Sequence, residues 1–298
     1  QNADLVLALG TRFGDRTTMR AGDFARRAVV VHVDIDPAEI GKNIPPFASL
    51  VGDVATILRQ LNPLLEGRER TEWLSQISEW RAAHPLTCHR PGEKLSARQV
   101  IRHVCRGADG DTVIVTGVGQ HQVFTAQEYA SPRPNGFVSS GGLGTMGFEL
   151  PASIGVQVAC PDETVWAVAG DGSLQMTMQE LSTIVQENLP IKIAVLHNGY
   201  HGMVRQLQEL YCRRNYVDVA LHTPDFVKLA EAYGIAALRV ENEQELAGAL
   251  ERARTHPGAF LLEFVVEPEE NVFPICAPGA SLDEMTEAPQ SVEASALE

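Results

Sequence analysis

The sequence predicts an α/β protein with doubly wound parallel sheets, and two observations support this fold class. Short apolar runs of strand length alternate with amphipathic helical segments along most of the chain. Several of these runs end beside a glycine and an acidic or amide residue, as at 170–171 and 198–199. In parallel sheets, loops of this kind collect at the carboxyl edge of the strands, where ligands bind.

Length and composition fit a globular chain of two domains. The 298 residues are 44% hydrophobic, which is enough for two cores. The formal net charge of −14 argues against a surface for nucleic acid or anionic membranes. No stretch approaches the roughly 18 consecutive apolar residues of a membrane span. The five cysteines lack CxxC spacing, so they indicate neither a zinc site nor a disulfide framework and fit a reducing cytoplasm.

Residues 164–204 predict a βαβ unit around which the rest of the chain is organised. An apolar strand over 164–169 stops at Gly170-Asp171-Gly172-Ser173, where two glycines permit a tight turn and a close approach by a ligand. A helix over 174–188 and a strand over 191–196 follow. The expected apolar face of this helix consists of Leu174, Met178, Leu181 and Val185.

Asp171 and Asn198 follow the two strands of this unit and therefore lie at neighbouring carboxyl ends. Such oxygen donors beside glycine-rich backbone suit Mg²⁺ that holds a diphosphate. Amide groups at the start of the 174–188 helix would add positive potential. The alternative is that Asp171 only caps the helix and Asn198 only forms a turn. The combination of GDGS with Asn198-Gly199 favours the magnesium site.

The first 65 residues predict a smaller α/β unit with strands over 4–10, 28–36 and 47–51. The second strand ends in Asp34 and Asp36, and a carboxylate at this position either binds a nucleotide ribose or begins the next helix. The local pattern leaves both interpretations open. GxGxxG is absent, so a dinucleotide site of the usual kind has no direct support.

Residues 66–95 are charged and predict a linker between a first domain, 1–65, and a second domain, 96–286. Residues 287–298 predict a flexible tail. Thr71 to Ala83 predicts an amphipathic helix in this linker. Its residues Trp73, Ile77 and Trp80 share one side and indicate packing rather than a cofactor site.

Two further glycine-rich loops follow predicted strands of the second domain. Gly117 to His121 follows the strand over 112–116, and Gly141 to Gly147 follows the short strand over 137–140. His121 is either a hydrogen-bonded residue at a helix start or a functional residue. Met146 is ordinarily a core residue.

These motifs resemble the acetohydroxyacid synthases, a family of thiamine diphosphate enzymes. The resemblance rests on GDGS with Asn198, on GGLGTMG, on VGQH, on GMV, and on LGTRFGDR and VHVDIDPAEIGKN near the start. It implies a doubly wound thiamine diphosphate-binding domain, preceded by the C-terminal half of a Rossmann-like, FAD-binding middle domain. Four residues depart from the family pattern, namely Gly14, Glu149, His197 and Leu207.

The resemblance also assigns sites. Mg²⁺ would be bound by the side-chain oxygens of Asp171 and Asn198 and the backbone carbonyl of Tyr200. Thiamine diphosphate would contact Val118, Gly119, Gln120, His121, Gly144, Met146, Gly170, Asp171, Gly172, Ser173, Asn198, Tyr200, Gly202, Met203 and Val204. FAD would contact Gly10, Thr11, Arg12, Asp34, Ile35, Glu39, Gly52, Asp53 and Val54. Met203 and Leu207 would line the pocket for the second substrate.

The implied reaction condenses two 2-oxoacids: pyruvate is decarboxylated on the cofactor and the product adds to pyruvate or 2-oxobutyrate. A homodimer or tetramer and a regulatory small subunit are implied as well. The activating glutamate of the family belongs to an N-terminal domain without a counterpart in these residues. We therefore expect the C-terminal part of a longer protein that binds cofactor without turnover.

Three alternatives stay open. The first is a related enzyme such as glyoxylate carboligase, pyruvate oxidase or a 2-oxoacid decarboxylase. The second is a nicotinamide dehydrogenase, which would need GxGxxG. The third is a non-catalytic cofactor-binding fragment.

Overall fold

The computed structural model describes residues 1–86, 94–108 and 110–288, and it divides into two compact units. Of these residues, unit 1 comprises 1–86 and 273–288, and unit 2 comprises 94–108 and 110–272. A search of the described residues finds no helix that is both long enough and apolar enough to cross a membrane.

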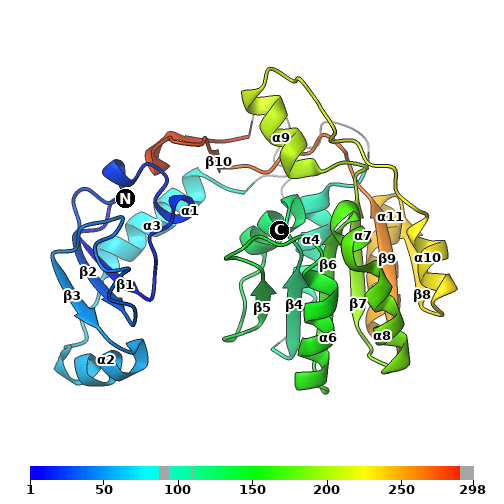
Figure 1. Cartoon of the computed structure of the whole chain (residues 1–298), viewed down its shortest axis with the longest axis horizontal. Helices are drawn as coiled ribbons and strands as arrows, with labels where there is room; N and C mark the ends of the chain where they lie inside the picture. Colours follow the sequence, from blue (N-terminus) through cyan, green and yellow to red (C-terminus); the bar gives the residue numbers. More distant parts are fainter. Residues whose placement is uncertain (87–93, 109, 289–298) are drawn as a thin grey trace. The chain divides into compact units, whose positions relative to one another are not determined.

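Unit 2 is built on a six-stranded sheet in the order β5-β4-β6-β7-β9-β8, and all of its strands are parallel (Figure 1). The central strands are continuous apolar runs because both faces of the sheet are covered. Their bounds are β4 (Thr112–Thr116), β5 (Phe137–Ser139), β6 (Thr164–Gly170), β7 (Lys192–His197), β8 (Ala236–Val240) and β9 (Phe260–Val265).

Helices pack on both faces of this sheet, each face with its own core (Figure 1). One core joins the sheet to α4 (Ala97–Arg106), α5 (Gln120–Glu128) and α11 (Glu243–Thr255). The other joins it to α6 (Glu149–Ala159), α7 (Asp171–Thr177), α8 (Leu181–Gln186) and α10 (Phe226–Ala232). The predicted doubly wound parallel α/β fold is therefore confirmed.

The strand order changes direction between β4 and β6. From β4 the chain runs outward to β5 on one side and then returns to form β6 on the other side. In open α/β sheets, such a switch point leaves a crevice beyond the carboxyl ends of the two strands. The loop 117–119 follows the end of β4. At the end of β6, helix α7 begins directly at Asp171, so the tight turn predicted at 170–173 is replaced by a helix start.

The helix predicted over 174–188 is interrupted. It begins at Asp171, and α7 gives way to a 3₁₀ turn, η3 (Met178–Glu180), before α8. Thr177 leaves helical geometry with φ near −136°, and its hydroxyl donates to the carbonyl of Gly147 at 2.9 Å. This interruption shifts the phase of the helix, so the predicted face was wrong in part. Met178 and Val185 are exposed, whereas Leu174, Leu181 and Ile184 are buried.

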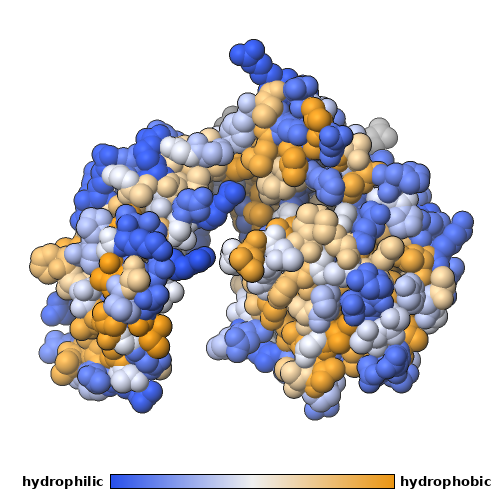
Figure 2. Space-filling view, viewed as in Figure 1, coloured by the Kyte–Doolittle hydropathy of each residue, from blue (hydrophilic) through white to orange (hydrophobic). Residues whose placement is uncertain are grey.

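Unit 1 contains a three-stranded parallel sheet in the order β1-β2-β3. The strands are β1 (Leu5–Leu9), β2 (Val29–Asp34) and β3 (Ala48–Val51), and the helices include α1 (Asp15–Thr18), α2 (Val54–Leu61) and α3 (Thr71–Ala83). Large apolar side chains are exposed on this unit: Leu5, Leu7 and Leu9 on β1, Leu50 and Val51 on β3, and Phe47 before it (Figure 2).

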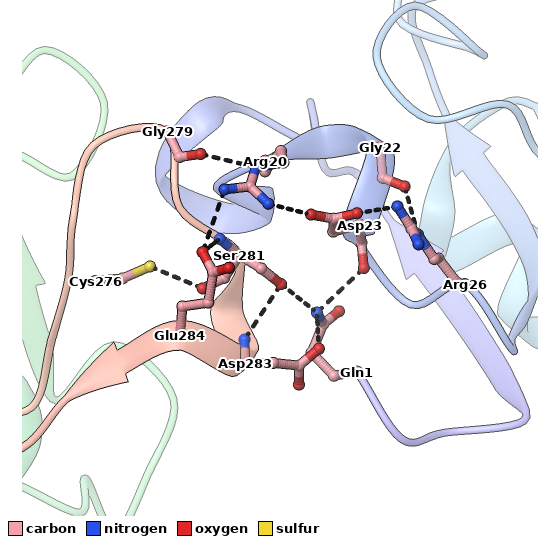
Figure 3. A network of polar contacts seen from close by, with 10 residues as sticks. All are labelled: Gln1, Arg20, Gly22, Asp23, Arg26, Cys276, Gly279, Ser281, Asp283 and Glu284. Atoms are coloured by element: carbon pink, nitrogen blue, oxygen red, sulfur yellow. Dashed lines mark hydrogen bonds and ion pairs between the residues drawn. The ribbon is translucent and has the colours of Figure 1, made fainter.

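Residues 273–288 pack on the N-terminal residues of unit 1. They form a hairpin of β10 (Ile275–Cys276) and β11 (Met285–Thr286), with a capping box between Ser281 and Glu284. Arg20 donates to the carbonyl of Gly279 at 2.9 Å and to Glu284 at 3.2 Å (Figure 3). The structure thus groups residues 273–286 with unit 1, whereas the predicted division placed them in the second domain. Of the predicted linker and tail, residues 87–93 and 289–298 lie outside the described residues.

Candidate cofactor and metal site

Asp171 and the loop after β7 meet at the carboxyl edge of the unit 2 sheet. β6 and β7 are hydrogen-bonded neighbours, and Gly170 pairs with Leu196. The Asp171 carboxylate accepts from the amide of Gly199 at 2.7 Å and from that of Gly172 at 2.8 Å. The structure therefore joins the loops that carry the two predicted metal-binding side chains.

Asn198 and Tyr200 lie in the same loop. The Asn198 side-chain oxygen accepts from the Tyr200 amide at 3.0 Å and keeps a second lone pair. The loop is held by two backbone hydrogen bonds, which use the Gly199 carbonyl and the His201 amide and not the Tyr200 carbonyl. Within the described residues no three His, Cys, Asp or Glu side chains form a metal-binding group. A cation here would be held by one carboxylate together with amide and carbonyl oxygens, a donor set that suits Mg²⁺.

The pKa of the Asp171 carboxyl group depends on its burial and on the loop after β7. Only 2% of Asp171 is exposed, and burial raises the pKa of its carboxyl group above the ordinary range. The amides of Gly199 and Gly172 and the nearby His197 and His201 oppose that rise. A cation bound at the carboxylate would favour its ionised form in the same way.

Gln120 and His121 bring the β4 loop into the site. The Gln120 side chain donates to Gln206 at 3.0 Å and accepts from the Asn198 amide at 3.4 Å. His121 lies against Gly170, where an added Cβ would come within 2.9 Å of its ring. Burial lowers the pKa of His121 to about 4, so the ring is neutral at pH 7. Its Nε2 has no hydrogen-bond partner among the described residues, as expected for a group that awaits a ligand.

Gly202, at the start of α9 (Gly202–Tyr211), allows the loops to approach closely. An added Cβ would lie 2.1 Å from the Gln120 side-chain oxygen and 2.8 Å from the Asn198 side-chain nitrogen. Because Gln120 is buried and hydrogen-bonded, the position favours glycine. Of the other residues predicted on this helix, Met203 packs partly against the core, Val204 is exposed and Leu207 is half-buried.

The glycine-rich loop 141–147 is tied to α7. The Gly147 amide donates to the Ser173 hydroxyl at 2.8 Å, and Thr177 donates to the Gly147 carbonyl. Gly144 adopts φ of +68°, and an added Cβ would contact Val118. Met146, the residue before Gly147 in this loop, is half-buried.

His197 stands where the family pattern has an asparagine, and the structure shows what it does instead. Its Nδ1 is 2.7 Å from Glu263 on β9, and its Nε2 is 2.9 Å from the Thr223 hydroxyl. Its ring also packs edge-on against Phe226. His197 therefore connects the ends of β7 and β9 with the loop before α10, while Asn198 keeps its contact with Gln120.

From the sequence alone, Glu149 is predicted only to depart from the family pattern. In the structure its side chain is fully buried at the start of α6 and accepts from the Ser173 hydroxyl at 2.9 Å. The signal available in the sequence was a carboxylate between Phe148 and Leu150 in an apolar helix start. Gln206 and His201, which contact the site from α9 and the loop before it, were also missed.

The residues predicted for FAD lie at the carboxyl ends of the three strands of unit 1. Backbone hydrogen bonds from Gly10 to Val33 and from Gly52 to Asp34 join these ends. Two of the carboxylates also have local structural roles. Asp34 accepts from the amide of Asp36 at 2.9 Å, and Asp53 caps α2 through Thr56. The other predicted positions are Thr11 and Arg12 after β1, Ile35 and Glu39 after β2, and Val54, the first residue of α2.

Comparisons with known proteins identify the family of this chain and several of its relatives. Residues 117–264 match the family described as "Thiamine pyrophosphate enzyme, C-terminal TPP binding domain", and residues 1–61 match the central domain of thiamine pyrophosphate enzymes. The chain is 42% identical over 97% of its length to an acetolactate synthase large subunit of Mycobacterium tuberculosis, of which it covers 49%. It is 41% identical over 95% of its length to the isozyme 3 large subunit of Escherichia coli, of which it covers 51%.

The acetolactate synthase large subunit of Porphyra purpurea is also 42% identical over 95% of the chain, which covers 49% of that protein. The chain thus spans about half the length of the curated relatives it matches.

Proposed function

We propose that this chain, which belongs to the thiamine pyrophosphate enzymes, provides the cofactor-binding part of an acetolactate synthase catalytic subunit. The proposed reaction condenses pyruvate with pyruvate to 2-acetolactate and CO₂, or with 2-oxobutyrate to 2-aceto-2-hydroxybutyrate, in branched-chain amino acid biosynthesis. The observation that carries the proposal is the joining of the GDGS segment at the start of α7, the Asn198 loop and Gln120 at the carboxyl edge of one parallel sheet, beside its switch point.

In this proposal Asp171, Asn198 and the Tyr200 carbonyl hold Mg²⁺, which binds the diphosphate of the cofactor. The Nε2 of buried His121, which has no partner in the part of the chain that the structure describes, and the close packing allowed by Gly202 support a fit to this group. Bound thiamine diphosphate supplies the carbanion chemistry. The residues of the chain would hold, orient and shield it, and Met146 and Met203 would contribute apolar side chains to its surroundings.

No residue of this chain is assigned as the activating glutamate, since neither Glu149 nor Glu180 stands in a matching motif. The remaining parts of the proposal rest on the family alone: FAD at the carboxyl edge of unit 1, a homodimer or tetramer, a regulatory small subunit, and a reducing cytoplasm. The described cysteines are free, which fits the last of these.

A related thiamine diphosphate enzyme and a non-catalytic cofactor-binding fragment remain the alternative functions. The related enzymes would share GDGS and Asn198, so product analysis with pyruvate separates them. The identity to acetolactate synthase large subunits favours the proposed reaction over these alternatives.

Calorimetric titration of the 298-residue chain with thiamine diphosphate, with and without Mg²⁺, tests the proposal. We expect saturable binding that requires Mg²⁺, and negligible acetolactate from pyruvate until the remaining part of the catalytic subunit is supplied. Absence of Mg²⁺-dependent binding would refute the cofactor assignment, and robust turnover by these residues alone would refute the external activating glutamate.

Leu207 is proposed to lie in the pocket for the second substrate, where the family pattern has tryptophan. In an acetolactate-forming assembly that contains this chain, we expect Leu207→Trp to raise the preference for 2-oxobutyrate several-fold. Competition between pyruvate and 2-oxobutyrate measures this preference as a product ratio. Leu210→Trp, on the same helix, serves as the control, and an unchanged ratio for Leu207→Trp would count against the assignment.

A further inference from the structure

Glu149 is a buried acid whose carboxyl group lies against two of the cofactor loops. Its exposed fraction is 0%, and one carboxyl oxygen accepts from the Ser173 hydroxyl at 2.9 Å. The same group lies against Gly117, where an added Cβ would come within 2.2 Å of Glu149 Oε2 and 2.5 Å of Ser173 Oγ. Its other oxygen, Oε1, has no hydrogen-bond partner among the described residues.

The hydrogen bonds of Ser173 depend on whether Glu149 is ionised. A serine hydroxyl has one proton to donate and two lone pairs to accept with. Ser173 accepts from the Gly147 amide and gives its only proton to Glu149. When Glu149 carries a proton, it can donate to the second lone pair of Ser173, and the serine proton is then free for another acceptor.

Among the described residues, the elements packed against α6 offer Glu149 no positive charge. Helix α6 packs against β4, β6, α7, η3 and α8. The charged groups on these elements are acidic, namely Asp171 on α7 and Glu180 on η3. His121 is neutral. Burial raises the pKa of Glu149 to about 7, and hydrogen bonds from its own backbone amide, the Ser173 hydroxyl and the Gly147 amide oppose this rise. An ionised Glu149 would therefore leave a buried carboxylate oxygen unpaired and would repel an anion at the adjoining loops.

We propose that Glu149 links diphosphate binding at this site to proton uptake: the carboxyl group is neutral when the diphosphate is bound, and the freed Ser173 hydroxyl donates to a diphosphate oxygen. Glu149 is thus a positioning residue that acts through Ser173. This inference rests on the proposed function, because it takes the cofactor diphosphate as the ligand of the GDGS loop. A carboxylate that only spaces α6 from α7 would bind no extra proton.

The sign of the pH dependence follows from this linkage. Since the bound state holds the proton more tightly, binding is favoured at low pH and weakens as pH rises through the pKa of the free protein, about 7. The Glu149→Gln variant is neutral at every pH and keeps the shape of the side chain. Because Asp171 and the cofactor titrate in both proteins, the difference between the pH dependences of their affinities reports the titration of Glu149.

The test is calorimetric titration of the 298-residue chain with Mg²⁺-thiamine diphosphate at about pH 6 and about pH 8.5, in two buffers of different ionisation enthalpy. We expect the affinity of wild type to fall roughly tenfold or more beyond that of Glu149→Gln across this range. Wild type should also take up more protons on binding than the variant. Glu180→Gln, which removes the neighbouring acid on η3, should keep the wild-type pH dependence.

If the affinities of wild type and Glu149→Gln fall by the same factor between the two pH values, the inference is overturned and the proposed function stands. Absence of binding by every protein at both pH values would instead count against the proposed function. If Glu149→Gln does not fold, infrared difference spectra of wild type with isotope-labelled glutamate decide the question. A new carboxylic acid C=O band on binding supports the inference, and its absence overturns it.

Discussion

Replacing Asp171 with Asn is expected to weaken Mg²⁺-dependent binding of thiamine diphosphate by roughly 100-fold or more, which corresponds to about 3 kcal/mol. The asparagine oxygen can still accept from the Gly199 amide, so the loops after β6 and β7 stay joined. The negative charge that would bind the cation is lost. Calorimetric titration at fixed Mg²⁺ concentration measures the effect.

Asp162→Asn is the matched control, because Asp162 lies exposed in the turn before β6 of the same unit. It should bind the cofactor like wild type. Circular dichroism of Asp171→Asn should also match wild type, since the substitution preserves size and an acceptor. A loss of less than about threefold for Asp171→Asn would mean that the cation, if bound, is held elsewhere.

Replacing Trp166 with Ala is expected to lower the free energy of unfolding of unit 2 by about 3–5 kcal/mol. Trp166 lies in the middle of β6, is 1% exposed, and belongs to the core that joins the sheet to α4, α5 and α11. Its loss leaves a cavity beneath β6, the strand that precedes Asp171. Urea unfolding followed by far-ultraviolet circular dichroism measures the change.

The other two tryptophans of the chain, Trp73 and Trp80, lie in α3 of unit 1. In the Trp166→Ala protein, tryptophan fluorescence therefore reports the unfolding of unit 1 alone. The urea concentration at the midpoint of this unfolding should be the same as for unit 1 of wild type. Trp80→Ala, at a position 38% exposed, should cost about 1 kcal/mol or less. A cost as small as this for Trp166→Ala would contradict the packing of the core.

Much of the fold could be predicted from local pattern. The continuous apolar runs of β4, β6 and β7 predicted buried parallel strands because such strands need no polar face. The α3 helix has the predicted bounds, Thr71–Ala83. The interruption after Thr177 could not be predicted, because it depends on a hydrogen bond to Gly147, a residue 30 positions away.

The candidate site shows the same division. Asp171 and Asn198 could be selected from the sequence, since each follows a predicted strand beside glycine. The contact between Gln120 and Asn198 could not, because it joins residues 78 positions apart through the strand order. The burial of Glu149 against Ser173 was equally hidden, since a charged residue at a helix start ordinarily faces solvent.

By itself, the sequence determined the α/β class, the positions of the glycine-rich segments after the strands and the family resemblance, because each depends on residues close together along the chain. The tertiary structure alone decided the switch point between β4 and β6 and the raised pKa of buried Glu149. It also decided that Nε2 of His121 has no hydrogen-bond partner among the described residues. These depend on which distant segments pack together and exclude water, and the free energy of a buried polar group is set by those neighbours.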